Sequence, residues 1–258
     1  MLQDETPPLS AAQPCVVSAA SKDCENAARR LAERIGLEYV PQPPDEQVRL
    51  SVAQGGLALA CGNLTLQPNL QGMLARLKPG RLQAELLVKA CKLKGLANPP
   101  VAVDATAGLG NDSLLLAAAG YQVHLYEKHP VIFALLESAV SQACESEDEL
   151  LRSAAMRMHL HNEDSVAALA NLEEPAHVVV LDPMFPARTK SAAVKKKFQL
   201  LHLLEQPCAN EDELLEAAFA AHPRKVVVKR PPKGPHLAHR KPAYALSGKA
   251  VRYDCYLP

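Results

Sequence analysis

The stretch Val101-Ala-Val-Asp104-Ala-Thr-Ala-Gly108-Leu-Gly110 decides the fold of this 258-residue chain. An apolar run ends at an aspartate, two glycines follow, and the sequence continues as Asn111-Asp-Ser-Leu-Leu-Leu-Ala-Ala. This order predicts a buried strand, a tight turn and a helix. Gly108 and Gly110 have no side chains to keep a ligand away from the backbone beside a helix N-terminus. The stretch therefore predicts a site for a nucleotide-like cofactor.

Strands and helices alternate regularly after this stretch. We expect strands over 122–126, 158–161, 177–181, 225–229 and 249–256, and helices over 112–119, 130–144, 165–172 and 212–221. Such alternation is typical of a doubly wound, mostly parallel sheet, here with an antiparallel C-terminal strand. We therefore predict a Rossmann-like α/β fold, in which ligands bind at the carboxyl ends of the strands.

The N-terminal part of the chain has a different pattern. Residues 23–37 have helical spacing that ends at Gly36, and residues 49–61 read as a β-hairpin around Gly55-Gly56. We expect a small α+β region over residues 1–78. Residues 79–258 would then form the larger domain.

Composition restricts the class of protein. The 28 Lys and Arg residues balance the 28 Asp and Glu residues, so any contact with nucleic acid must be local. The sequence contains no apolar run of the roughly 18–20 residues that span a bilayer, and its acidic start does not resemble a signal peptide. The seven cysteines include no C-x-x-C pair, which is typical of reduced thiols. We expect a cytoplasmic protein.

Four acidic residues follow the predicted strands. Glu127 comes where an acid accepts hydrogen bonds from the ribose hydroxyls of an adenosine-type cofactor, although a solvated strand-end glutamate is the simpler explanation. Asp104 either supports the glycine turn or contacts the cofactor. Asp164 either reaches an adenine amino group or caps the next helix. Asp182 is the fourth.

The segment Asp182-Pro183-Met184-Phe185-Pro186 is the second specific signal. The Asp182 carboxylate and the Pro183 carbonyl can each accept a hydrogen from an exocyclic amino group, and Phe185 can stack on the base. The prolines restrict the backbone of the segment. The alternative is a proline-rich turn after a core strand, with Phe185 as packing. Beside the glycine turn and Glu127, we interpret Asp182, Pro183 and Phe185 as catalytic.

Two cofactors fit the glycine turn. A dinucleotide fingerprint needs a third glycine or an alanine where this chain has Ser113. S-adenosylmethionine (SAM) uses the same turn and ribose acid without a pyrophosphate. The segment after Asp182 has a role in methyl transfer to an amino group and none in hydride transfer, so the sequence favours SAM over NAD.

The order of the motifs resembles the ribosomal RNA small subunit methyltransferase J family over about residues 78–256. The similarity rests on five segments: 104–110, Tyr126-Glu-Lys128, 182–186, Lys190-Ser-Ala-Ala-Val-Lys-Lys196 and Val226-Val-Val-Lys-Arg-Pro231. Enzymes of this family are class I SAM methyltransferases that act on the N2 amino group of one guanosine in 16S rRNA. The resemblance implies that fold, that cofactor, and 16S rRNA or a small-subunit particle as partner.

The resemblance also implies a set of cofactor-binding residues: Asn111, Asp112, Glu127, Lys128, Glu163, Asp164 and Asp182. The glycine turn adds Asp104, Gly108 and Gly110 to this set. The chain departs from the family pattern at several of them. Asn111 and Lys128 stand where the family usually has arginine, and Glu163-Asp164 replaces a serine pair. The usual Gly-Gly-Arg-Gly-Glu is Pro79-Gly-Arg-Leu-Gln83 here.

Basic residues near Asp182 indicate an RNA partner. Residues 182–241 hold 12 Lys and Arg against 6 Asp and Glu, counted from the sequence. We predict that Lys195, Lys196, Lys229 and Arg230 bind phosphates. The alternatives are a solvated surface, which explains any single lysine, and a role of Lys229-Arg230-Pro231 in bracing the last hairpin. The pair His159 and His161 lacks a further metal ligand nearby, so we expect no metal. Other open alternatives are an adenine N6 or protein glutamine methyltransferase and an NAD-dependent oxidoreductase.

Overall fold

The computed structural model describes residues 14–95, 99–172, 174–183, 199–201, 203, 204 and 210–258. These residues form two compact units. One contains residues 14–66 together with the described residues between 199 and 204, and the other contains 67–183 and 210–258. Leu70, Met73 and Leu77 belong to the core of the second unit, whereas the sequence places a boundary after residue 78. The assignment of domains stays a prediction.

The first unit contains a four-stranded sheet in the order β1-β2-β3-β4. Its strands are β1 (Val16–Ala19), β2 (Arg49–Ala53), β3 (Gly56–Cys61) and β4 (Leu64–Leu66). β1 and β2 are parallel, and β2 and β3 form the predicted antiparallel hairpin. The short helix η1 (Lys22–Cys24) leads into α1 (Glu25–Ile35), which ends at Gly36 with φ 69°. Helix α1 packs on β1 through its buried apolar residues.

The second unit contains a seven-stranded sheet in the order β10-β11-β9-β8-β5-β6-β7. Five strands are parallel: β5 (Val101–Asp104), β6 (Gln122–Tyr126), β7 (Met158–His161), β8 (Val178–Leu181) and β9 (Lys225–Arg230). β10 (Tyr244–Ser247) and β11 (Arg252–Tyr256) complete it in antiparallel pairing. The predicted doubly wound, mostly parallel fold is confirmed. β10 is an additional strand, because the sequence predicts only one strand after β9.

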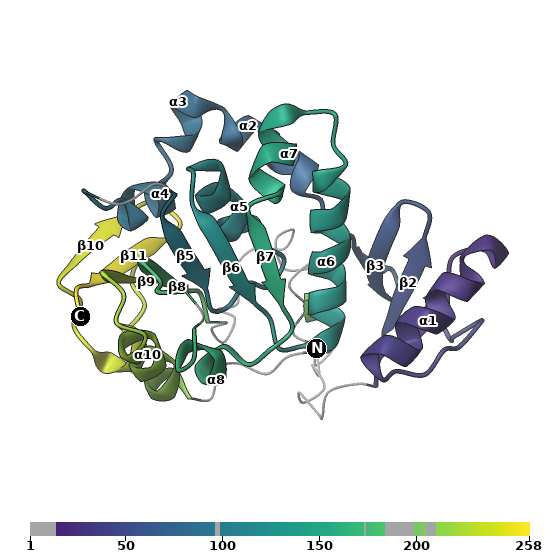
Figure 1. The fold of residues 1–258 in the computed structure, drawn as a ribbon. Coiled ribbons are helices and arrows are strands. Elements are labelled where there is room, and N and C mark those ends of the chain that lie inside the picture. The colour runs from purple at the N-terminus through teal and green to yellow at the C-terminus, as the bar shows by residue number, and fades with distance from the viewer. Residues whose placement is uncertain (1–13, 96–98, 173, 184–198, 202, 205–209) are drawn as a thin grey trace, which may run out of the picture. The chain divides into compact units, whose positions relative to one another are not determined.

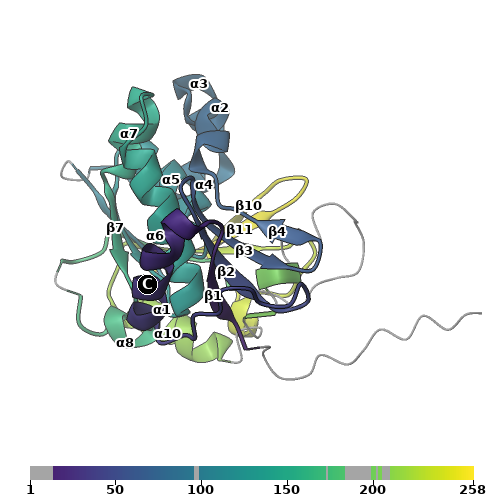
Figure 2. The same ribbon diagram turned by 90° about the vertical axis from the view of Figure 1, so that its right-hand side faces the viewer.

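Helices cover both faces of this sheet. The elements that contribute to the core on one face are η2 (Leu70–Met73), α2 (Leu74–Leu77), α3 (Pro79–Leu82), α4 (Leu86–Cys91), α5 (Asn111–Ala118), α6 (Pro130–Cys144) and α7 (Glu149–Ala155). The core on the other face is built with α8 (Ser165–Leu169), α10 (Glu211–Ala220) and η3 (Leu237–His239). α7, which the sequence analysis did not predict, lies beside both α5 and α6 (Figure 1, Figure 2).

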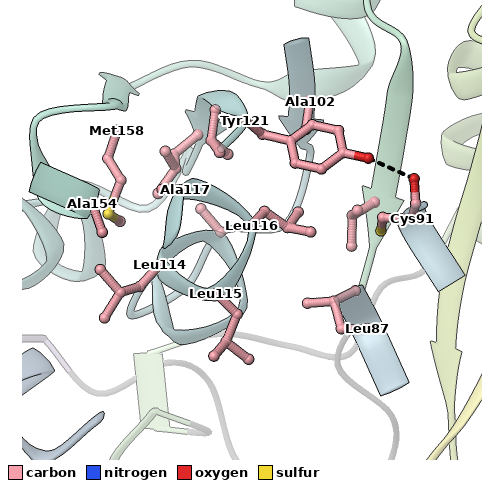
Figure 3. Close-up of a cluster of buried hydrophobic side chains, with 14 of the residues drawn as sticks. Leu87, Cys91, Ala102, Leu114, Leu115, Leu116, Ala117, Tyr121, Ala154 and Met158 are labelled. Carbon is pink, nitrogen blue, oxygen red and sulfur yellow. Dashed lines mark hydrogen bonds between the residues drawn. The ribbon is translucent and has the colours of Figure 1, made fainter. Parts of the chain in front are cut away.

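Helix α5 is the centre of the larger core. Leu114, Leu115, Leu116 and Ala117 are fully buried, so apolar residues surround this helix on successive faces (Figure 3). The nearby Tyr121 hydroxyl donates to the Cys91 carbonyl at 2.7 Å. Because residues 113–117 are buried, α5 holds its N-terminus in a fixed place at the carboxyl end of β5.

Strand order favours a ligand-binding crevice at that end of the sheet. β5 pairs with β6 on one side and with β8 on the other, so the chain changes direction across the sheet between β5 and β8. Ligands of doubly wound sheets bind outside the carboxyl ends of the strands at such a point. Asp104 ends β5, and Asp182 follows β8.

Candidate active site

Asp104 organises the turn between β5 and α5. The side chain is buried, with 2% of its surface exposed. One carboxylate oxygen accepts from Ser113 Oγ at 2.5 Å, and the other accepts from the Thr106 backbone amide at 3.2 Å. Burial raises the pKa of the Asp104 carboxyl to about 6. These contacts correspond to structural support of the turn, which is one of the two roles that the sequence allows.

The two glycines of the turn are required for different reasons. Both have a left-handed backbone, with φ 53° at Gly108 and φ 76° at Gly110. A Cβ atom at Gly110 would come within 2.6 Å of Leu136 Cδ1 in the core, whereas among the described residues one at Gly108 would meet nothing closer than Thr106 O at 4.0 Å. Gly110 therefore allows packing, and Gly108 leaves open space beside the backbone.

Glu127 joins the end of β6 to the glycine turn. The side chain is 7% exposed, and its two carboxylate oxygens accept from the backbone amides of Gly108 at 3.1 Å and His129 at 2.8 Å. The structure thus places the predicted ribose acid directly against the turn. Each oxygen of an ionised carboxylate can accept a further hydrogen bond, so this position is compatible with the predicted role.

A lysine bridges two aspartates at the carboxyl end of the parallel strands. Lys229 Nζ, from β9, lies 2.7 Å from Asp112 Oδ2 in the first turn of α5 and 2.7 Å from Asp182 Oδ2 after β8. The exposed fractions of the three side chains are 24%, 18% and 38% respectively. The sequence predicts Asp112 and Asp182 as neighbours of the cofactor, and the structure brings them together through Lys229.

The pKa values of Lys229 and Asp182 in this bridge are raised for different reasons. Burial would lower the pKa of the Lys229 ammonium, but the carboxylates of Asp112 and Asp182 outweigh burial and raise it. Burial raises the pKa of the Asp182 carboxyl, and Lys229 offsets part of that increase. Lys229 therefore stays charged, and its positive charge favours the ionised form of Asp182.

Asp182 is also tied to the glycine turn by its backbone. Its amide donates to Thr106 Oγ1 at 2.6 Å. Pro183 follows and is buried. The segment after β8 and the turn after β5 are therefore fixed against each other. Phe185, the third residue predicted to be catalytic, lies outside the described residues.

Comparison with known proteins assigns the chain to a family. Residues 31–258 match the family model described as "Putative SAM-dependent methyltransferase". The chain is 40% identical to the ribosomal RNA small subunit methyltransferase J of Acinetobacter baumannii over 87% of this chain and 82% of the relative. The protein of that name from Pseudomonas aeruginosa is 40% identical over 96% of both chains. The chain belongs to the ribosomal RNA small subunit methyltransferase J family.

A solved structure supports the same assignment. The crystal structure of a SAM-dependent methyltransferase from Neisseria gonorrhoeae superposes with a TM-score of 0.72 and 29% sequence identity, covering 95% of this chain and 96% of the other. The resemblance read from the motifs is thereby confirmed. This chain is a SAM-dependent methyltransferase of the family.

The remaining predicted cofactor residues of this family member lie after β6, after β7 and at the start of α5. Lys128 and Asp164 are exposed and form an ion pair with Nζ 3.8 Å from Oδ2. Asp164 Oδ1 also accepts from the Val166 amide at 2.9 Å, so it caps α8, which is the other role that the sequence allows. Glu163 and Asn111 are exposed. Their roles toward SAM stay predictions.

The predicted RNA-binding residues of the family member have different surroundings in the structure. Arg230 is 1% exposed, and its guanidinium donates to the Pro235 carbonyl and to Glu211. A phosphate cannot reach a side chain that is enclosed in this way, so the prediction for Arg230 needs correction, and its contacts brace the segment after β9. Lys229 belongs to the carboxylate bridge. Lys195 and Lys196 lie outside the described residues.

Some side chains near the crevice were not predicted. Thr106 accepts from Asp182, and Asn162 Nδ2 donates to the Glu127 carbonyl at 2.8 Å. Arg76 forms a two-pronged pair with Glu85 at 2.7 and 2.8 Å. Tyr253, which pairs with Lys229 in the β9–β11 register, is 5% exposed. Single threonine, asparagine and tyrosine residues carry no distinctive spacing, so the sequence offered no signal for them.

His159 and His161, which the sequence analysis considered as metal ligands, lie in β7. His124 Nδ1 is 3.1 Å from His161 Nε2, and the rings of His124 and His159 stack with centroids 5.0 Å apart. Among the residues that the structure describes, no group of three His, Cys, Asp or Glu side chains is arranged to hold a metal ion. Within the same residues, no helix is long and apolar enough to cross a membrane.

Proposed function

We propose that this protein transfers the methyl group of SAM to the N2 amino group of a guanosine in 16S rRNA. The observation that supports this most is the bond from the Asp182 amide to Thr106 in the glycine turn. It fixes the segment that accepts hydrogens beside the turn that approaches the cofactor. The names of the relatives add that the substrate is small-subunit ribosomal RNA.

The residues of the turn suit SAM as a ligand. The backbone at Gly108 faces open space, Glu127 lies against it, and α5 begins directly after it. In the proposed complex, Gly108 allows close approach and Glu127 accepts hydrogen bonds from the ribose hydroxyls. SAM supplies a methyl group that its sulfonium already activates. The protein mainly has to align donor and acceptor.

Asp182 and Pro183 would prepare the acceptor nitrogen. The lone pair of a guanine amino group is delocalised into the ring, which makes the nitrogen a weak nucleophile. Hydrogen bonds from this amino group to the Asp182 carboxylate and the Pro183 carbonyl direct the lone pair toward the methyl group. Transfer forms a nitrogen–carbon bond, breaks a carbon–sulfur bond and releases one proton from the nitrogen. A paired base cannot enter such a site, so the target is unpaired or flipped out.

The partner in this proposal is 16S rRNA, either free or within a small-subunit particle. Such RNA places the reaction in the cytoplasm. Because the chain has no net charge, contact with RNA phosphates relies on local basic side chains, among which we keep Lys195 and Lys196.

Mass mapping of 16S rRNA from cells with and without the gene tests the proposal. We expect one guanosine to lose a single methyl group in the deletion strain, and the Asp182→Ala variant to fail to restore it. The same variant should retain most of its affinity for S-adenosylhomocysteine in calorimetry, because Glu127 and the turn are intact. A methyl group lost from adenine, unchanged rRNA, or binding of NAD in place of S-adenosylhomocysteine would contradict the proposal.

A further inference from the structure

Lys229 occupies a position that the methyl-transfer scheme does not yet use. Its ammonium group lies 2.7 Å from one oxygen of Asp112 and 2.7 Å from one oxygen of Asp182, with three quarters of the side chain shielded from solvent. We propose that Lys229 is a positioning residue that keeps the Asp182 carboxylate ionised and fixed beside the N-terminus of α5. This role rests on the proposed function.

The geometry separates this role from phosphate binding. An ammonium group has three hydrogens to donate, and two of them are directed at carboxylates of different elements. Two partners at 2.7 Å, the short end of charged hydrogen bonds, hold the side chain in one place. A lysine that serves RNA phosphates would instead extend into solvent, as exposed lysines do.

An ionised Asp182 is needed because only the charged form is purely an acceptor. A protonated carboxyl carries a hydrogen of its own and loses acceptor capacity. Partial burial favours that protonated form, and the nearby Asp112 carboxylate favours it further. The positive charge of Lys229 acts against both and favours the ionised form, in which Asp182 can accept hydrogens from an amino group.

Other charged or titratable groups also face Asp182 from the surrounding elements. Asp104 from β5 and Asp112 from α5 contribute negative charge, and Tyr253 from β11 is neutral because burial raises its pKa. Arg230, next to Lys229 on β9, adds positive charge from the other side of the strand. Arg230 is bonded to Pro235 and Glu211. Among the residues that the structure describes, Lys229 is therefore the cation in direct contact with Asp182.

This arrangement predicts opposite effects for the two partners of Asp182. Lys229→Met removes the positive charge, so the pKa of Asp182 should rise. Asp112→Asn removes the competing carboxylate and leaves Lys229 to Asp182, so the pKa of Asp182 should fall. A lysine with a structural role alone would not produce shifts of opposite sign.

The experiment has two measurements on the full chain. The first is the titration of Asp182 in protein labelled with ¹³C at the aspartate carboxyl carbons, with the signal assigned from the Asp182→Asn variant. The second is the pH dependence of kcat for methyl transfer to small-subunit RNA at saturating SAM. We expect Lys229→Met to move both the titration and the acid limb of kcat to higher pH by about one to three pH units. Asp112→Asn should move both to lower pH.

Controls decide between the possible outcomes. Lys229→Arg should restore the wild-type midpoint, and Lys89→Met, at an exposed lysine of α4, should leave the Asp182 titration unchanged. Thermal unfolding identifies variants that are not folded, and Asp112→Asn and Lys229→Arg still test the inference if Lys229→Met does not fold. Coincident midpoints in folded variants would overturn the role of Lys229. Absence of methyl transfer by the wild-type protein would instead overturn the proposed function, while the titration would still report on Lys229.

Discussion

At the scale of single residues, Gly108 and Gly110 serve different purposes in the same turn. Both have positive φ, which costs about 1–2 kcal/mol for a residue with a Cβ atom. At Gly110 the Cβ would also collide with the fully buried Leu136. Packing therefore adds to backbone strain at Gly110, and at Gly108 it does not.

Alanine substitutions should separate packing from ligand approach. We predict that Gly110→Ala lowers the free energy of unfolding by roughly 2–5 kcal/mol, since overpacking of a core adds about 1–3 kcal/mol to the strain. Gly108→Ala should cost only about 1–2 kcal/mol but weaken binding of S-adenosylhomocysteine by about tenfold or more, because the new methyl group enters the open space. Denaturant unfolding and calorimetry measure the two effects. Equal losses of stability, with unchanged affinity for Gly108→Ala, would contradict this division.

Lys229 and Arg230 show what sequence cannot tell at this scale. They are neighbours in one basic motif, but successive side chains of a strand point to opposite faces. Lys229 therefore meets α5 and Asp182, whereas Arg230 meets Glu211 of α10. The sequence indicated positive charge close to Asp182, and this was right. Which of the two residues reaches the crevice depends on pairing across the sheet, which a linear motif does not contain.

At the scale of elements, Glu127 couples β6 to the turn between β5 and α5. Its carboxylate accepts from the amides of Gly108 and His129. A glutamine at this position presents one oxygen and one amino group, so one of the two amides would face a donor instead of an acceptor. The turn would then lose an anchor even without any ligand.

We predict that Glu127→Gln lowers the free energy of unfolding by about 1.5–3 kcal/mol, the usual contribution of a hydrogen bond to a charged group. It should also weaken binding of S-adenosylhomocysteine, because the turn and the proposed acceptor for the ribose hydroxyls are both changed. Thermal and denaturant unfolding with calorimetry provide the measurements. The matched control is Glu163→Gln at an exposed loop position, where stability should change by no more than about 0.5 kcal/mol. Equal stability of the two variants would refute the anchoring role.

Apolar runs predicted most of the elements around the site. β5 and β8 are buried along their whole lengths, and their continuous valine-rich sequences identify strands covered on both faces. β10 was missed because its side chains are mostly exposed at the edge of the sheet, so no burial pattern marks it. α7 was missed because it is a short helix, and its start depends on the cap that Asp148 makes with Leu150 and Leu151.

At the scale of the whole molecule, the compact units do not follow each other along the chain. The unit that contains residues 14–66 also includes the described residues between 199 and 204, which come after β8. Leu200, Leu201 and Leu204 in this segment are buried. A domain boundary placed where the sequence pattern changes assumes that each domain is one continuous segment. It therefore cannot describe a unit that consists of two separate segments of the chain.

The free energy of unfolding depends on pH through carboxyl groups whose contributions have opposite signs. Asp104 has a folded-state pKa of about 6 against an ordinary value of 3.8. The folded state thus binds the proton more tightly, so this contribution is fully present below about pH 4 and is lost as pH rises through 6. The burial of Asp182 acts in the same direction. Glu85 acts in the opposite direction, because its hydrogen bonds from Arg76 lower its pKa and stabilise the fold at higher pH.

Substitution of Asp104 by asparagine isolates the contribution of Asp104 to this pH dependence. The amide keeps an acceptor for the Thr106 amide and offers a donor to Ser113 Oγ, so the turn retains both contacts. We predict that the stability of Asp104→Asn relative to wild type rises by about 2.5 kcal/mol between pH 4 and pH 7, since most of the free energy of a pKa difference of about two develops in this range. Denaturant unfolding at both pH values measures it, with Asp212→Asn at an exposed position of α10 as the control. A difference that does not change with pH would mean that Asp104 is ionised at little cost, and the turn would then need a source of stabilisation for that charge other than Ser113 and Thr106.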